Sequence, residues 1–187
     1  MVYLLCYNIY VRGDKVTYKT YYNSPIGKIL LVGKEGKLFG LWFEGQRYYL
    51  DNIKEELILK DDEPVLVETK KWLDEYFNGK KPSINKLSLQ LTGSNFRKIV
   101  WRELCNIPYG TITTYKDIAK KVAEKNNKAK MSCRAVGGAI SHNPISIIIP
   151  CHRVIGVNGN LTGYAAGVDK KVKLLKHEKV DTTKINY

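Results

Sequence analysis

The stretch SIIIPCHRVIG, residues 146–156, brings three isoleucines up to a proline and then places a thiol, an imidazole and a guanidinium in succession. The isoleucine run is too short for a lone amphipathic helix and predicts a buried strand or extended segment. Pro150 has no backbone donor, so strand pairing should stop there. We therefore expect Cys151, His152 and Arg153 at the point where a buried element ends and a rigid support can hold a polar site.

The chain around this stretch has the composition of a folded protein with one large domain or two small ones. It has 187 residues, of which 44% are hydrophobic and 11% aromatic. No run approaches the roughly 18 apolar residues that a membrane span needs. The first residues also lack the basic and apolar regions of a secretion signal. We expect a soluble, cytoplasmic protein with no membrane partner.

The cysteines Cys6, Cys105, Cys133 and Cys151 are scattered and form no CxxC pair. This spacing argues against a disulfide scaffold or a zinc ribbon and predicts free thiols. For Cys6 and Cys105 we expect the role of small hydrophobic core residues. Residues 1–90 contain one cysteine and no histidine, so we predict no metal site and no cofactor.

The net charge of +13 is distributed unevenly along the chain. Residues 1–90 carry 14 Lys and Arg against 12 Asp and Glu, whereas residues 91–187 carry 17 against 6. A lysine-rich solvated surface, as in heat-adapted proteins, is one interpretation, but it would be expected to carry matching glutamates. The imbalance favours a polyanionic partner, with nucleic acid first.

The first half of the chain has the pattern of a small sheet with one helix. Residues 15–23 have strand composition, and residues 28–43 contain two apolar runs joined by the hairpin signal Gly33-Lys34-Glu35-Gly36. Residues 64–79 place apolar side chains on one helical face, between a proline and a glycine. We predict an N-terminal sheet-and-helix domain over residues 1–88.

The second half, residues 89–187, has a helical pattern. Ser94 and Ser132 are expected to cap helices, and Thr114 with Asp117 forms a possible capping box. Two short helices separated by a loop, in the basic half of the chain, resemble a helix-turn-helix. Two ordinary amphipathic core helices are the alternative.

The second of these helices contains Gly137 and Gly138 in its interior. Each glycine costs a helix about 1 kcal/mol relative to alanine, so the pair needs a reason. Without side chains, the helix can approach another helix or a nucleic-acid backbone closely. Arg134, one turn earlier, should point outward from the start of the helix, either for recognition or as an ordinary surface cation.

Four motifs of the second half resemble one family. PCHRV at 150–154, RAVGGAISHNPISIII before it, and GYAAG and LLKHE after it are similar to the O6-alkylguanine-DNA alkyltransferases. These DNA-repair proteins are also called methylated-DNA–protein-cysteine methyltransferases. The resemblance extends from about residue 94 to residue 178. It implies an α+β protein with two domains: a ribonuclease H-like N-terminal domain with a small antiparallel sheet, and a mostly helical winged-helix or helix-turn-helix domain that carries the reactive cysteine.

The resemblance assigns the chemistry to Cys151, which would accept the alkyl group from O6 of a guanine rotated out of duplex DNA. A thiolate is a strong, soft nucleophile suited to an sp³ carbon, and the thioether product leaves the protein spent after one lesion. His152 would act on Cys151 through water, with Glu178 orienting the imidazole. Asn143 would be a hinge between the recognition helix and the site. A surface charge at Glu178 and a turn residue at Asn143 are the alternatives.

The resemblance also implies how DNA is held. Arg134 would enter the base stack, Tyr115 would crowd the 3′ phosphate and donate to the flipped guanine, and Ala135, Gly137 and Gly138 would lie against the DNA. The base pocket would be lined by Ile140, Val154, Ile155, Tyr164, Ala165 and Lys171. Many relatives have serine where this chain has Ala165, so only a backbone donor to O6 would remain. We expect a monomer acting on double-stranded DNA that contains O6-alkylguanine, and the sequence leaves open whether O4-alkylthymine is a second substrate.

Two other functions remain open from the sequence. A helix-turn-helix binding module would recognise alkylated bases without chemistry, but such a module needs no thiol at residue 151. A cysteine hydrolase would turn over many times, but the chain lacks an oxyanion-hole signature, and hydrolysis gives no role to the glycine pair or to the basic half.

Overall fold

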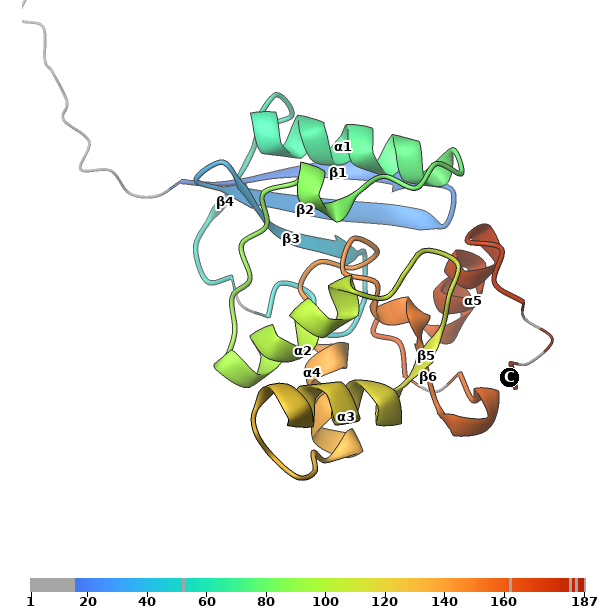
Figure 1. The fold of residues 1–187 in the computed structure, drawn as a ribbon. Coiled ribbons are helices and arrows are strands. Elements are labelled where there is room, and N and C mark those ends of the chain that lie inside the picture. Colours follow the sequence, from blue (N-terminus) through green and yellow to red (C-terminus); the bar gives the residue numbers. More distant parts are fainter. Residues whose placement is uncertain (1–15, 52, 162, 182, 184, 187) are drawn as a thin grey trace, which may run out of the picture.

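The fold comes from a computed structural model, which describes residues 16–51, 53–161, 163–181, 183, 185 and 186. A sheet covered by one helix forms the upper part of the molecule in Figure 1, and a group of helices forms the lower part. We call these the sheet part (β1–β4 and α1) and the helical part (α2–α5). Cys6 lies outside the described residues.

The sheet part has four strands in the order β3-β2-β1-β4. The strands are β1 (Thr17–Ser24), β2 (Gly27–Lys34), β3 (Lys37–Phe43) and β4 (Leu57–Leu59). The long strands pair antiparallel with one another, β1 with β2 and β2 with β3, as predicted, whereas the short β4 pairs parallel to β1. Glu35 and Gly36 form the predicted hairpin turn and both have positive φ, 52° and 69°.

Helix α1 (Pro64–Phe77) covers one face of this sheet (Figure 1). Pro64 occupies the first turn, where its missing backbone donor costs nothing, and Gly79 follows the end with φ 76°. The predicted helix over residues 64–79 is therefore confirmed. Its apolar face buries Leu66, Leu73 and Tyr76 against the sheet and the helical part.

Among the described residues, the helical part contains four α-helices and short connecting elements. The turn η1 (Ile84–Lys86) precedes this part. In chain order, its elements are α2 (Asn95–Cys105), β5 (Thr113–Thr114), α3 (Tyr115–Lys125), α4 (Cys133–Ser141), η2 (Cys151–Arg153), β6 (Val154–Ile155), η3 (Val157–Gly159) and α5 (Val168–His177). Ser94, Thr114 and Ser132 accept backbone hydrogen bonds at the starts of α2, α3 and α4, which confirms the three predicted caps.

Helices α3 and α4, with the loop between them, form the predicted helix-turn-helix arrangement, and α2 packs against both. The indole Nε1 of Trp101 in α2 donates to the carbonyl of Ala139 in α4 at 2.8 Å, and Lys125 of α3 pairs with buried Glu103 of α2. Strands β5 and β6 pair parallel and connect the start of α3 to the segment after Cys151. These contacts fix α4 relative to that segment.

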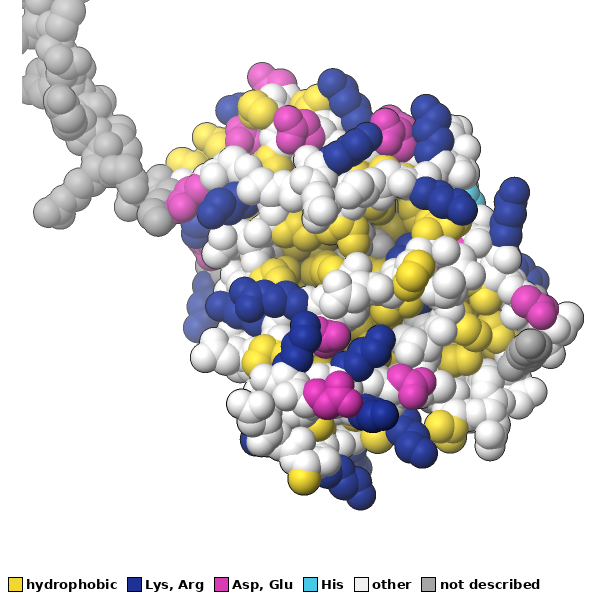
Figure 2. All heavy atoms as spheres, viewed as in Figure 1, with side chains coloured by type: hydrophobic (Ala, Val, Ile, Leu, Met, Phe, Trp, Pro, Cys, Tyr) yellow, Lys and Arg dark blue, Asp and Glu magenta, His cyan; other side chains and the backbone are white. Residues whose placement is uncertain are grey.

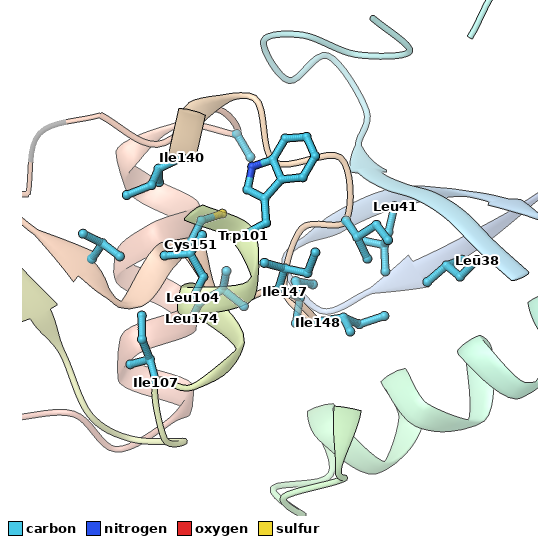
Figure 3. Close-up of a cluster of buried hydrophobic side chains, with 14 of the residues drawn as sticks. Leu38, Leu41, Trp101, Leu104, Ile107, Ile140, Ile147, Ile148, Cys151 and Leu174 are labelled. Atoms are coloured by element: carbon cyan, nitrogen blue, oxygen red, sulfur yellow. The ribbon is translucent and has the colours of Figure 1, made fainter. Parts of the chain in front are cut away.

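The two parts share one hydrophobic core. The β3 backbone continues its pairing with the helical part, because the amide of Leu41 donates to the carbonyl of Pro144 and the amide of Ser146 donates to that of Leu41, both at 2.9 Å. Figure 3 shows the core running from Leu41 through Ile147 to the surroundings of Cys151. On the face seen in Figure 2, a largely hydrophobic hollow of about 230 Å³ lies between α1 and the end of α2, where the sheet part meets the helical part.

The isoleucine run before Pro150 is buried as expected, but the prediction of a strand there was wrong. Only Ile145 makes a bridge, to Leu41, and the chain then turns. Ile147 has φ 68°, a conformation that is costly for a β-branched residue. The turn is held because all three isoleucines fill the shared core.

None of the described helices is long and apolar enough to cross a bilayer.

Candidate active site

Cys151 begins the single turn η2, directly after Pro150. It is 5% exposed and lies among core side chains, including Leu104 and Ile140 (Figure 3). Its Sγ accepts a hydrogen bond from Nδ2 of Asn143 at 3.1 Å. The thiol is therefore held in place by a side-chain amide from the turn that follows α4.

Asn143 ties three segments together. Besides Sγ, its Nδ2 lies 2.8 Å from the carbonyl oxygen of Ile149 and 3.3 Å from that of Ile145, and its Oδ1 accepts from the amide of Ile145 at 3.0 Å. The side chain is buried, and its contacts define the turn between α4 and Cys151. An asparagine here fixes the strained turn and the thiol at once.

Glu178, at the end of α5, is the centre of a buried hydrogen-bond network. Its side chain is fully buried and faces His152, with Nε2 2.8 Å from Oε1. Arg153 donates to both carboxylate oxygens, from Nε at 2.8 Å and from Nη2 at 2.9 Å. Tyr76 of α1 donates to Oε1 at 2.7 Å, and the amide of Gly110 donates to Oε2 at 3.1 Å. The carboxylate thereby joins η2 to α1 and to the loop after α2.

These contacts fix the protonation states of the pair. Burial opposes ionisation of Glu178, but the hydrogen bonds and charges of His152 and Arg153 outweigh it and hold its pKa below the usual range. Burial lowers the pKa of His152, and the contact with Glu178 opposes that effect only in part. An ionised Glu178 requires a proton on Nε2, so neutral His152 carries its lone pair on Nδ1. Among the described residues, Nδ1 has no hydrogen-bond partner.

The thiol is not strongly acidic by itself. Burial raises the pKa of Cys151, while the hydrogen bond from Asn143 and the charge of Lys171 act in the opposite direction. Lys171 is fully buried on α5, and its Nζ donates to the carbonyl of Val154 at 2.6 Å. Desolvation lowers the pKa of Lys171 to about 8, with the charge of Cys151 opposing. A thiolate at Cys151 therefore needs both a base to take its proton and Lys171 to stabilise its charge.

Tyr115, the first residue of α3, lies beside the site. Its hydroxyl donates to the carbonyl of Gly163 at 3.1 Å, and its ring lies 3.8 Å from where a Cβ on Gly137 would stand. Burial, and the charge of Cys151 after it, raise the pKa of Tyr115 to about 12, so the hydroxyl stays a donor at neutral pH.

The outer surface of α4 is largely open. Arg134, Ala135 and Gly138 are exposed, as expected for a helix that reads a ligand. A Cβ on Gly138 would meet no atom within 4 Å, and one on Gly137 would make only ordinary contact with Tyr115. Among the described residues, close packing of a second protein helix therefore does not explain the glycine pair.

The residues predicted for the base pocket do not all lie together. Ile140 and Val154 belong to the core cluster that contains Cys151, and Tyr164 packs against it. The carbonyl of Ala165 accepts from the amide of Arg47 at 2.9 Å, which anchors this loop to the sheet part. Ile155 packs in a separate cluster with Leu161 and Leu175, so its place in a pocket stays a prediction.

The family follows from comparison with known proteins. The model for the DNA binding domain of 6-O-methylguanine DNA methyltransferase matches residues 95–180, and the model for its ribonuclease-like domain matches residues 17–91. The chain belongs to the 6-O-methylguanine DNA methyltransferase family. The resemblance noted from the sequence motifs is confirmed, and so is the α+β fold with a sheet-and-helix part before a helical part.

Relatives of this methyltransferase-family chain match it over most of its length. The methylated-DNA–protein-cysteine methyltransferase of Methanosarcina barkeri is 45% identical over 155 residues, 83% of this chain and 92% of the relative. That of Haemophilus influenzae is 37% identical over 163 residues, 87% of each chain. The crystal structure of Mycobacterium tuberculosis OGT in complex with DNA has a TM-score of 0.74 and 35% identity, covering 87% of this chain and 92% of that one.

In this family member, three contacts of the site were not predicted from the sequence. Arg153 was visible in the PCHR motif, but its bidentate pairing with Glu178 was not. Tyr76 and Gly110 carry no local signal, because their partner lies 102 and 68 residues away in the chain. The described cysteines Cys105, Cys133 and Cys151 are free, and within the described residues no group of three or more His, Cys, Asp or Glu is placed to hold a metal ion.

Proposed function

We propose that this protein repairs DNA by transferring the alkyl group of O6-alkylguanine to Sγ of its own Cys151, as a methylated-DNA–protein-cysteine methyltransferase. The observation that carries the proposal is the arrangement around that atom. A buried thiol is held by Asn143, and the next residue, His152, is bonded to an ionised Glu178. All of these residues lie within the segment that matches the family's DNA binding domain, residues 95–180.

The transfer is a displacement at the alkyl carbon. Nδ1 of neutral His152 takes the thiol proton through a bridging water, and Lys171 stabilises the thiolate. The Sγ–carbon bond then forms as the carbon–O6 bond breaks, and the departing guanine recovers a proton. The raised pKa of Tyr115 keeps its hydroxyl protonated, and this hydroxyl would exchange its bond with the Gly163 carbonyl for one to the guanine. The thioether has no easily displaced leaving group, so we propose that each molecule acts once. O4-alkylthymine presents the same kind of bond and is a further substrate.

The basic helical part would hold the duplex. α4 would lie against the DNA with Ala135, Gly137 and Gly138 facing it, and Arg134 would fill the gap left by the extruded base. The extruded base would be received by Ile140, Val154, Ile155, Tyr164 and Ala165. Support for this orientation comes from the exposure of Arg134 and from the open space at Gly138.

Three further assignments belong to this proposal. The protein acts as a monomer, since one chain holds the nucleophile, its base and the exposed helix. It works in the cytoplasm, where reducing conditions keep Cys151 a free thiol. The division into residues 1–88 and 89–187 follows the change from sheet to helices, with the two parts packed on a shared core.

A titration of lesions tests the proposal against its rivals. The protein is mixed with increasing amounts of duplex DNA that carries O6-methylguanine, and the repaired lesions are counted. We expect repair to reach a plateau at about one lesion per protein molecule. A binding module would repair none, and a cysteine hydrolase would continue past the plateau; either result would reject the proposed function.

A further inference from the structure

Tyr76 connects the sheet part directly to the reactive site. It lies on α1, is 1% exposed, and its hydroxyl donates to Oε1 of Glu178 at 2.7 Å across 102 residues of sequence. Its ring is held in an aromatic cluster, with centroids 5.6 Å from Trp72, 5.9 Å from Tyr109 and 5.0 Å from the imidazole of His177. The hydroxyl therefore has a fixed position relative to the carboxylate.

The same carboxylate oxygen serves the imidazole. Oε1 accepts from Tyr76, His152 and Arg153 at 2.7, 2.8 and 2.9 Å, whereas Oε2 accepts from Gly110 and from Arg153. Donors to one oxygen share its negative charge, so each weakens the interaction of the others. Among the described residues before residue 90, Tyr76 is the one hydrogen-bond partner of this carboxylate.

We infer that Tyr76 is a positioning residue for alkyl transfer: its hydroxyl fixes the Glu178 carboxylate against Nε2 of His152 and limits how strongly that carboxylate attracts the imidazole. The inference rests on the proposed function and extends it, since it makes α1 a working component of the site. Without this hydroxyl, Oε1 would carry more negative charge toward His152.

The direction of the effect follows from the surrounding charges. The titratable and charged groups that face this pair are Glu178, Arg153, Cys151 and Lys171 around the His152 imidazole, and Tyr109 and His177 around Tyr76. Removing the Tyr76 hydroxyl leaves these charges unchanged and removes one positive dipole end near Oε1. Protonated His152 then becomes more favourable, and its pKa rises. Only neutral His152 can take the thiol proton. As the solution is acidified, the variant should therefore lose transfer at a higher pH than the wild type.

Tyr76→Phe isolates this effect, since it deletes the hydroxyl and keeps the ring in its cluster. Tyr109→Phe is the matched control. Its ring packs on that of Tyr76, but its hydroxyl donates only a long bond, 3.4 Å, to the carbonyl of His177. A loss of aromatic packing or of contact between the two parts would affect the control in the same way.

The experiment measures the rate of transfer from a free O6-alkylguanine base to the full-length protein between about pH 5 and pH 9. A free base removes DNA binding from the rate. In parallel, the imidazole of His152 is titrated by NMR in the wild type and both variants. We expect the acid limb and the His152 titration of Tyr76→Phe to move up by about 0.5–1 pH unit, and those of Tyr109→Phe to stay with the wild type.

Four other outcomes are distinguishable. A Tyr76→Phe profile that falls equally at every pH, or that coincides with the wild type, overturns the inference. An equal shift in both variants also overturns it, since packing would then be the cause. A wild-type protein that transfers nothing refutes the proposed function, and with it a role of Tyr76 in transfer. In that case an NMR shift of His152 confined to Tyr76→Phe still supports the effect of the Tyr76 hydroxyl on the imidazole, and equal titrations overturn that effect too.

Discussion

At the residue scale, reactivity depends on opposing effects at one sulfur atom. Burial raises the pKa of Cys151, and each pKa unit corresponds to about 1.4 kcal/mol against the thiolate. The hydrogen bond from Asn143 and the charge of Lys171 stabilise the thiolate and offset part of this cost. The remainder must come from a base, and the lone pair on Nδ1 of His152 is suited to that role. Burial alone therefore disfavours the thiolate of Cys151.

Arg134→Ala should slow repair of duplex DNA much more than reaction with a free O6-alkylguanine base. The arginine is expected to stabilise the extruded state by a few kcal/mol, and a free base needs no extrusion. Rate measurements on both substrates check this. Arg102→Ala is the control, because it removes the same charge from an exposed position on α2. Equal slowing of both substrates by Arg134→Ala would contradict the assignment.

Glu178→Gln should destabilise the fold as well as the chemistry. It leaves the buried Arg153 guanidinium without a counter-charge, which costs about 3–5 kcal/mol at neutral pH. The folded pKa of Glu178 is lowered, so its contribution is present above the unfolded value of about 4.3 and is lost as pH falls toward the folded pKa. The difference between wild type and variant should therefore shrink below about pH 4.

Urea unfolding at neutral and acidic pH measures this difference. Glu44→Gln serves as the control, since its pairing with Lys28 is exposed and long, 3.8 Å, and should contribute less than about 1 kcal/mol. A Glu178→Gln variant as stable as the control at neutral pH would show that the buried network does not hold the site together.

At the element scale, α4 has two glycines in its interior and an outer surface that is largely exposed. Gly137 and Gly138 weaken the helix, yet the described protein atoms leave room for a Cβ at both positions. The capping of α4 by Ser132 and the bond from Trp101 to Ala139 compensate for this weakness. The helix is thus kept in place from its start and its inner face, and its outer face stays smooth.

Gly138→Ala should raise the free energy of unfolding by about 0.5–1 kcal/mol and at the same time weaken binding to duplex DNA. The methyl group meets no atom of the described residues within 4 Å, but it would stand between α4 and a closely approaching DNA backbone. Urea unfolding and a DNA-binding titration on the same variant check both parts. A more stable variant that binds DNA as well as the wild type would place the duplex elsewhere.

The elements differ in how far the sequence predicts them. The caps at Ser94 and Ser132 and the hairpin at Gly36 were predictable, since each depends on residues within three positions along the chain. The isoleucine run was not, because its turn at Ile147 is imposed by the core and by Asn143. A local sequence pattern predicts hydrogen bonds between residues that are close in the chain. It does not predict which distant residues are brought together by folding.

The same limit holds for the site. Cys151, His152 and Glu178 could be expected together because their motifs resemble those of a family. The bond from Tyr76 could not, since the helical face that predicts its burial says nothing about which carboxylate its hydroxyl reaches. Sequence motifs therefore indicated the residues proposed to react, and the structure was needed to find the residues that hold them.

At the scale of the whole molecule, the two parts act as one body with unequal charge. The core is continuous from β3 through Ile147 to Cys151, so the sheet part supports the site directly (Figure 3). The basic excess belongs to residues 91–187, which contain α3 and α4. A long-range field from this half would attract a polyanion to the side that carries α3 and α4.

Binding to duplex DNA should therefore weaken steeply as salt rises. Roughly four to six phosphate contacts give a log–log slope of about −4 to −5. Transfer from a free alkylated base should hardly respond, because no polyanion takes part. Measuring both between low and moderate salt checks the prediction. A slope near zero on DNA would mean that the lysines only solvate the surface.

The most direct test of the central claim is the mass of the peptide that contains Cys151 after the protein has reacted with duplex DNA bearing O6-methylguanine. We predict one added methyl group on that peptide and none on the peptides that contain Cys105 or Cys133. Cys151→Ser should still bind the DNA, since the hydroxyl has nearly the same shape, but it should acquire no methyl group, because a hydroxyl is far less nucleophilic. Repaired DNA together with an unmodified Cys151, or methyl transfer to the Cys151→Ser variant, would contradict the account.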